Sequence, residues 1–235
     1  MGRTAATVER TVASIASPLP LGEGQGEGVT PSPGQALAIV GDVANRDDVQ
    51  RAVRSTVSTF GRLDALVANA GIQLHARERA IHESEDDVWD QTLDVNARGV
   101  FLTCRAGIRQ MVEQGQGGAV VITSSITALV GTNGHNPAYT ASKGALLSLG
   151  RALAVYYGPQ NIRVNVVCPG ALSEPPDVQN LADPAAREAR VVPNIPLGRL
   201  GQFDEIAPMV AFLCGPESTY ATGGVFTIDG GLTAR

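Results

Sequence analysis

The residues of this chain best suited to chemistry are a tyrosine and a lysine four positions apart, Tyr139 and Lys143, in the segment Y-T-A-S-K at 139–143. On a helix, side chains at this spacing share one face, with Cβ atoms roughly 5–6 Å apart. The Lys143 ammonium would then favour the Tyr139 phenolate and bring a pKa of about 10 closer to neutrality, where a phenol is a usable acid or base. Because an exposed helix can carry the same pair by chance, the surrounding sequence must decide between catalysis and a solvated helix face.

Four further motifs surround this pair in a fixed order. They are V-A-N-A-G at 67–71, D-V-N at 94–96, V-V-I-T-S-S at 120–125 and N-V-V-C-P-G at 165–170. Their order and spacing resemble those of the short-chain dehydrogenase/reductase family, and the likeness runs from about residue 35 to residue 231. Several independent motifs agree, so the resemblance is much more specific than a single match.

The resemblance implies a catalytic tetrad of Asn96, Ser125, Tyr139 and Lys143. Tyr139 would exchange a proton with the substrate oxygen while hydride moves to or from a nicotinamide, and Lys143 would lower the phenol pKa and bind the nicotinamide ribose. Ser125 would hydrogen-bond the reacting oxygen, although its spacing from Tyr139 is one residue longer than the family's and makes Ser124 its rival. Asn96 would hold a water connecting to the lysine, or would only bond backbone at a helix bend.

The same resemblance implies a binding site for NAD or NADP. The expected contacts are an adenine-side pair, a turn along the adenine ribose, the tyrosine and lysine, and a loop beside the nicotinamide: Asp42, Val43, Asn69, Ala70, Gly71, Tyr139, Lys143, Pro169, Gly170 and Leu172. Family members continue this loop with a threonine that bonds the carboxamide, where this chain has Ser173 and Glu174. A carboxylate there would repel the cofactor's phosphates, unless Ser173 takes the place of the threonine.

The elements that must position these residues alternate along the chain. Apolar runs predict strands at 36–40, 63–68, 119–123, 163–167 and 223–228, and longer segments predict helices at 45–60, 81–114, 137–157 and 204–213. This alternation predicts an α/β chain with a Rossmann-like, doubly wound parallel sheet. Trp89 is expected in its core.

Residues 1–35 break that rhythm. They are expected to form a helix and a low-complexity Gly- and Pro-rich loop ahead of a single domain at 36–235. Family members carry a turn, T-G-x-x-x-G-x-G, that receives the pyrophosphate at a helix N-terminus, and this sequence contains no such turn. The resemblance therefore predicts a fold shortened by its first strand, first helix and second strand. To satisfy the strand groups left unpaired, we expect the strand at 36–40 to pair directly with that at 63–68, giving five strands.

Charge and cysteine usage exclude several other classes. A formal net charge of -5 and a pI near 5.2 argue against nucleic acid as a partner. The three cysteines, Cys104, Cys168 and Cys214, lack metal-ligand spacing and indicate a reducing compartment, so no metal is expected. No apolar run is long enough to span a bilayer and no signal-peptide core is present, so we expect no membrane and a cytoplasmic location.

Two functions from different classes fit these observations. The first is an oxidoreductase that transfers hydride between NAD(P) and a small alcohol or ketone, with a homo-oligomer, a dimer or tetramer, as the expected assembly. The second is a shortened, non-catalytic relative that binds no dinucleotide and has a structural or regulatory role; a start codon inside the true gene is a third interpretation. The sequence leaves NAD versus NADP and the substrate itself open, because the segments that select them have no match here.

Overall fold

Four parallel strands form the centre of the molecule. A computed structural model describes residues 36–131, 136–173 and 183–234, so the expectations for 1–35 and for Glu174 lie outside the described residues. The strands are β1 (Ala65–Ala68), β2 (Gly118–Thr123), β3 (Ile162–Pro169) and β4 (Val225–Ile228), and they lie in that order. All three pairings are parallel, so the carboxyl ends of the strands meet at one edge of the sheet.

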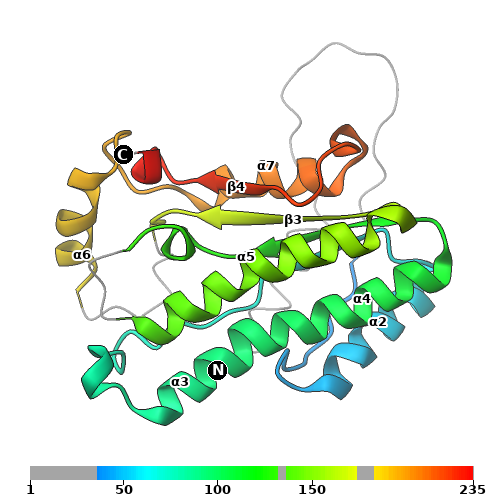
Figure 1. The fold of residues 1–235 in the computed structure, drawn as a ribbon, viewed down its shortest axis with the longest axis horizontal. Helices are drawn as coiled ribbons and strands as arrows, with labels where there is room; N and C mark the ends of the chain where they lie inside the picture. The colour runs from blue at the N-terminus through cyan, green and yellow to red at the C-terminus, as the bar shows by residue number, and fades with distance from the viewer. Residues whose placement is uncertain (1–35, 132–135, 174–182, 235) are drawn as a thin grey trace.

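Helices cover both faces of this sheet (Figure 1). The first face carries α2 (Arg46–Phe60), α4 (Val100–Gln114) and α5 (Pro137–Tyr157), and the second carries α7 (Phe203–Cys214). The short helices α3 (Asp86–Leu93) and α6 (Pro184–Val191) lie towards the carboxyl ends of the strands. The expected α/β fold with a doubly wound parallel sheet is confirmed.

Local sequence explains where the helices of the first face begin. The Asn45 side chain accepts hydrogen bonds from the amides of Asp47 (2.9 Å) and Asp48 (3.3 Å), which caps α2. That helix ends at Gly61, whose φ of 86° is the left-handed conformation that glycine adopts without strain. The first helical position of α5 is Pro137, where the missing N–H costs nothing.

The prediction of five strands is wrong: the described residues form four, and the segment 36–40 is not a strand. Its apolar side chains are not buried, since Leu37 is 44% and Val40 63% exposed. The segment is held instead by the Arg51 guanidinium, which donates to the Val40 carbonyl at 3.0 Å. A short apolar run becomes a strand only where it finds a ladder partner and a surface to cover.

The long helix predicted at 81–114 is also divided. It consists of a 3-10 turn at Ile81–Glu83, then α3, a π-helical turn at Asp94–Gly99 and α4. Trp89 is 43% exposed on α3, so its expected place in the core is wrong. Within the described ranges, no helix combines the length and apolarity that crossing a membrane requires.

Candidate active site

Lys143 is a buried cation at the carboxyl edge of the sheet. Its side chain is only 4% exposed, and its Nζ donates to the carbonyl of Thr123, at the end of β2, at 3.0 Å. Burial lowers the pKa of Lys143 to about 8, because the charged form loses hydration, and the neighbouring Cys168 opposes that shift. The lysine is therefore an ammonium at neutral pH and loses its proton in the mildly alkaline range.

Tyr139 lies one helical turn before the lysine on α5, with the Lys143 Nζ 5.7 Å from its ring centroid. Burial raises the pKa of the Tyr139 phenol above its ordinary value; the Ser125 side chain works against this shift and the charge of Glu78 adds to it. The expected lowering of this pKa by Lys143 is therefore wrong for the protein alone, because desolvation of the phenolate is the larger effect. At neutral pH the phenol carries its proton and is suited to act as an acid.

The structure separates the two candidate serines. The Ser124 hydroxyl donates to the Lys143 carbonyl at 2.8 Å, which ties the end of β2 to α5. The Ser125 side chain accepts from the Thr127 amide at 3.2 Å and faces the phenol of Tyr139. This geometry favours Ser125 over Ser124 for the predicted role beside the Tyr139 hydroxyl.

Asn96 occupies the π-helical turn at Asp94–Gly99, an irregularity that often marks functional positions. It is fully buried, and its amide accepts from the Ile72 amide (2.7 Å) and donates to the Ile72 carbonyl (2.9 Å) and the Ser142 hydroxyl (3.0 Å). The backbone-bonding interpretation thus describes its protein contacts, and the bridging water stays a prediction. Asn96 fixes the chain after β1 against the helix that carries Tyr139.

Gly71 places the turn after β1 next to Asn96 and Lys143. A Cβ atom at Gly71 would lie 3.2 Å from Asn96 Oδ1 and 3.3 Å from Lys143 Nζ, so even a methyl group would crowd both. Its backbone therefore lies directly against two of the four predicted catalytic residues.

Residues predicted to contact the adenine side of a dinucleotide gather around a small hollow. This hollow of about 50 Å³ is lined in part by Val43, Asn69, Ala70 and Gly99. Asp42 is exposed, and its side chain accepts from the Ala44 amide at 2.9 Å. The structure thus brings Val43 together with Asn69 and Ala70, and it leaves the Asp42 carboxylate engaged in its own turn.

The loop after β3 packs against the C-terminal strand. The Gly170 amide donates to the Ile228 carbonyl at 2.9 Å, and a Cβ at Gly170 would lie 2.6 Å from the Asp229 Cα. Leu172 forms a bridge with Gly201, and Pro169 is the last residue of β3. The next residue, Ser173, donates its hydroxyl to the Gln202 side chain at 2.8 Å, so it is already engaged within this loop.

Three polar residues of this region were not predicted. The Ser142 hydroxyl accepts a hydrogen bond from Asn96, and the Thr123 carbonyl accepts one from Lys143. Glu78 is a buried carboxyl whose charge raises the pKa of Tyr139. Ser142 stands inside the Y-T-A-S-K segment, where its position next to the lysine was a usable signal. Glu78 is flanked by Arg77 and Arg79, a pattern typical of a solvated surface, so nothing in its local pattern indicated burial. In the part of the chain that the structure describes, no group of three His, Cys, Asp or Glu side chains could hold a metal.

Comparison with known proteins identifies the family of this chain. A family model described as "Enoyl-(Acyl carrier protein) reductase" matches residues 12–233. The 2-(R)-hydroxypropyl-CoM dehydrogenase of Xanthobacter autotrophicus is 38% identical over 200 residues, 85% of this chain and 79% of that protein. The chain belongs to the short-chain dehydrogenase/reductase family.

Solved structures show the same likeness. Levodione reductase superposes with a TM-score of 0.78 at 34% identity, covering 86% of this chain and 78% of that one. Carveol dehydrogenase from Mycobacterium avium, determined in complex with NAD, gives a TM-score of 0.75 at 32% identity, covering 83% of this chain and 73% of the other.

Proposed function

We propose that this protein is an oxidoreductase that transfers hydride between NAD or NADP and a small alcohol or ketone. The observation that carries the proposal is the pair on α5, in which the buried Lys143 lies beside the half-buried Tyr139 and Ser125 faces the phenol. Relatives named as a dehydrogenase and as a reductase support a reaction that runs between alcohol and carbonyl. The catalytic roles of Asn96, Ser125, Tyr139 and Lys143 are part of this proposal.

The residues at the carboxyl edge fit a dinucleotide. Gly71 and Gly170 present bare backbone where a Cβ would meet its neighbours, and ligands approach the sheet at this edge in doubly wound folds. Tyr139 and Lys143 would hold the nicotinamide ribose. The remaining contacts would come from the adenine side and from the loop beside the nicotinamide, through Asp42, Val43, Asn69, Ala70, Gly71, Pro169, Gly170 and Leu172. The nicotinamide supplies or accepts the hydride.

The protein's own residues supply the proton. Ser125 holds the substrate oxygen, and the Tyr139 hydroxyl donates its proton to that oxygen in the reductive direction and takes one from the alcohol in the oxidative direction. Because burial raises the pKa of Tyr139, its protonated form prevails at neutral pH. We therefore expect reduction to be favoured near neutrality and oxidation to gain as the pH rises.

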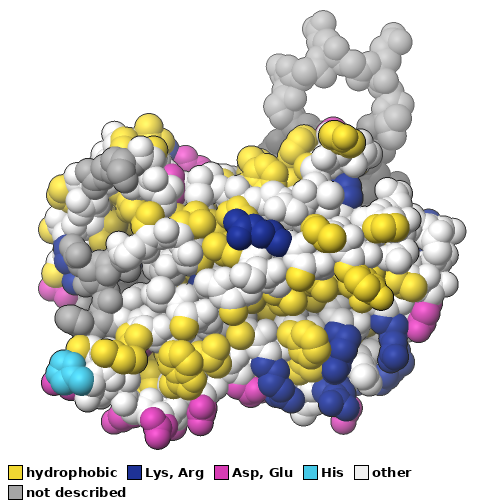
Figure 2. Space-filling model, in the orientation of Figure 1, with side chains coloured by type: hydrophobic (Ala, Val, Ile, Leu, Met, Phe, Trp, Pro, Cys, Tyr) yellow, Lys and Arg dark blue, Asp and Glu magenta, His cyan; other side chains and the backbone are white. Residues whose placement is uncertain are grey.

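A homo-oligomer is part of the same proposal. Large apolar side chains are exposed along α4 and at the end of α5, among them Phe101, Val112, Val155 and Tyr156, and Val155 is 81% exposed. Figure 2 shows hydrophobic groups over this face, bordered by arginines. A second copy of the chain would remove this apolar surface from water. Sedimentation of the purified protein tests this: a dimer or tetramer is expected, and a monomer at micromolar concentration would contradict it.

Turnover measurements test the proposed function. The purified protein is assayed with NADH and NADPH against a panel of small ketones, and with NAD and NADP against the matching alcohols. The Tyr139→Phe variant should lose turnover by about 100-fold or more, since the proton donor is gone. Tyr220→Phe is the matched control, because Tyr220 is fully exposed and should leave the rate unchanged. Full activity in Tyr139→Phe would refute the role given to the phenol, and an inactive wild type would favour the non-catalytic alternative.

A further inference from the structure

Ser142 is a buried serine on α5 that the proposed reaction does not yet use. It is 0% exposed, so its hydroxyl is removed from water. A buried hydroxyl destabilises the fold unless it is hydrogen-bonded, and alanine would form a helix more readily at this position. The reason for a serine here must therefore lie in the bonds that its hydroxyl makes.

The Ser142 hydroxyl joins two of the residues proposed to be catalytic. It donates to the Tyr139 backbone carbonyl at 2.7 Å and accepts from the Asn96 side-chain amide at 3.0 Å. A hydroxyl has one proton to donate, and here that proton goes to the Tyr139 carbonyl, so the oxygen is left to accept from Asn96. The two bonds form a continuous chain from Asn96 to the backbone of the residue that carries the phenol.

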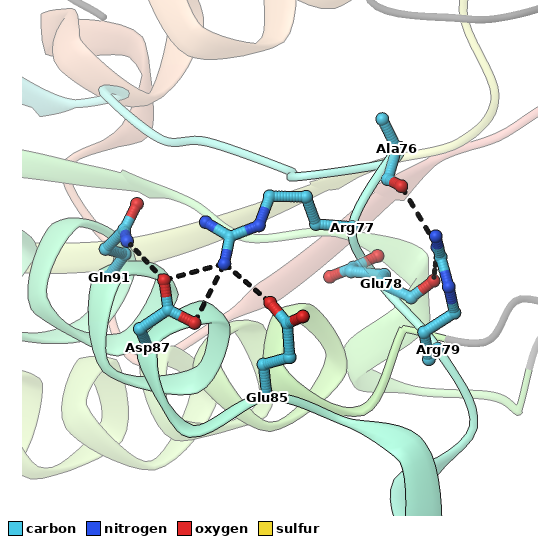
Figure 3. A network of polar contacts seen from close by, with 7 residues as sticks. All are labelled: Ala76, Arg77, Glu78, Arg79, Glu85, Asp87 and Gln91. Carbon is cyan, nitrogen blue, oxygen red and sulfur yellow. Dashed lines mark hydrogen bonds and ion pairs between the residues drawn. The ribbon is translucent and has the colours of Figure 1, made fainter.

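The Asn96 end of this chain of bonds is anchored to backbone. The Asn96 amide bonds both the N–H and the carbonyl of Ile72, at 2.7 and 2.9 Å. The loop that follows Ile72 is tied at its far end to the start of α3, because the Arg77 guanidinium bonds Glu85 at 2.7 Å and Asp87 at 2.6 Å (Figure 3). The chain of bonds therefore starts from a loop that is held at both ends.

The first turn of α5 is weakly held by its own cap. Asn136 occupies the N-cap, but its side chain makes no hydrogen bond to the amides of the first turn, and Pro137 follows it. The amides of a first turn have no partner within the helix, and the absence of a side-chain cap costs about 1 kcal/mol. Tyr139 lies in this turn. The bond from Ser142 to its carbonyl thus supports the part of the helix that would otherwise fray.

We propose that Ser142 is a positioning residue for Tyr139, whose hydroxyl ties the weakly capped first turn of α5 to Asn96. The proposal rests on the catalytic role proposed above for Tyr139. A phenol transfers its proton only across hydrogen-bond distance to the substrate oxygen, so small displacements of its helical turn slow the reaction. Alanine in place of Ser142 removes the tie and leaves a buried amide hydrogen of Asn96 without its partner.

Amide hydrogen exchange tests the tie without cofactor or substrate. In Ser142→Ala the backbone amides of residues 140–143 should exchange about 5- to 10-fold faster than in the wild type, because the hydrogen bond that resists local opening is gone. Ser148→Ala is the matched control, since Ser148 is an exposed serine of the same helix and should leave these rates unchanged. Equal exchange rates in the wild type and in Ser142→Ala would overturn the proposal.

Steady-state kinetics separates positioning from a purely structural role. The kcat of Ser142→Ala should fall by about 10-fold while the KM for the dinucleotide stays unchanged, because the tie acts on the proton donor. Ser142→Thr keeps a hydroxyl and should recover most of the lost kcat. A wild-type kcat in Ser142→Ala would contradict the proposal, as would a loss confined to the KM for the dinucleotide.

The unsubstituted protein keeps the test open if the variants fail to fold. Both side-chain amide hydrogens of Asn96 should exchange slowly in its NMR spectrum, since one is bonded to the Ile72 carbonyl and the other to the Ser142 hydroxyl. Rapid exchange of either hydrogen would refute the chain of bonds. Neither exchange measurement needs dinucleotide binding or turnover, so failure here and failure of the proposed function are distinguishable.

Discussion

The corner of the site around Lys143 is buried and closed by contacts between distant segments, whereas the corner around Asp42 is exposed and combines bonds within its own turn with one from Arg98 to the Ala44 carbonyl at 2.9 Å. Lys143 bonds the carbonyl of Thr123, and Ser124 bonds its backbone. Asp42 bonds the amide of Ala44 and is exposed. Both corners belong to one proposed dinucleotide site, but only the first is buried.

The difference in burial predicts different costs for substitutions at the two corners. Removing a partner inside the buried corner leaves polar groups without water to replace it, which costs about 1–3 kcal/mol for each group. At the exposed corner water takes over the lost bond, so substitutions there should have small effects on stability. The catalytic corner should thus keep its shape without cofactor.

The largest expected contrast is between two asparagines. Asn96→Ala leaves both the Ile72 amide and the Ile72 carbonyl without their side-chain partner in a buried place, so we expect a loss on the order of 3 kcal/mol in the free energy of unfolding. Asn45→Ala, at the exposed corner, removes a helix cap and should cost about 1 kcal/mol. Urea denaturation of both variants measures these losses, and equal losses in unfolding free energy would contradict the predicted contrast between the two corners.

The next largest effect is the pH dependence of stability that the buried Lys143 causes. Its pKa is about 8 in the folded protein, against 10.5 for a free lysine side chain. Between these values the unfolded chain binds a proton that the folded one has released, so stability rises with pH in this window. The unfolding free energy of the wild type should therefore rise relative to that of Lys143→Met by up to about 3 kcal/mol from pH 8 to 10.5. Taking the difference between the two proteins cancels other groups, and a flat difference would contradict the burial of a charged lysine.

A smaller effect is expected at Gly71. Its new Cβ in Gly71→Ala would press on Asn96 and Lys143, and overpacking of this kind costs about 1–3 kcal/mol. Gly144→Ala on α5 is the control, because nothing lies within 4 Å of its Cβ position and alanine favours a helix. Thermal unfolding should show a lower Tm for the first and an unchanged or higher Tm for the second; a lower Tm in both would remove the argument for crowding at Gly71.

The smallest effect should come from Asp42. Asp42→Ala loses one exposed turn bond, so its free energy of unfolding should stay within about 0.5 kcal/mol of the wild type. If the carboxylate contacts the adenine side as proposed, dinucleotide affinity should fall even so. Denaturation of the Asp42→Ala variant checks its stability, and cofactor titration checks its dinucleotide affinity. A large loss of stability would show that the Asp42 carboxylate does more than bond within its own turn.

The sequence predicted those helices and strands whose apolar side chains meet a neighbouring element in the fold. The helix at 137–157 and the strand at 119–123 follow from periodicity and burial, because each meets a neighbour that covers its apolar side. The run at 36–40 is also apolar, but it pairs with no strand among the described residues, so composition alone misled. Glu78 could not be found either, since its burial comes from tertiary packing that the local pattern of charged neighbours does not reveal. The choice between Ser124 and Ser125 likewise needed the turn after β2.

The most direct test of the central claim is whether a nicotinamide dinucleotide reaches Tyr139. Fluorescence of NADH and NADPH is followed as each is added to the purified protein, with Lys143→Met as the comparison. We predict saturation in the micromolar range for one of the two cofactors, with weaker binding to the variant. No saturation at millimolar concentration, where the binding free energy is only about -4 kcal/mol, would contradict the proposal and favour the non-catalytic relative.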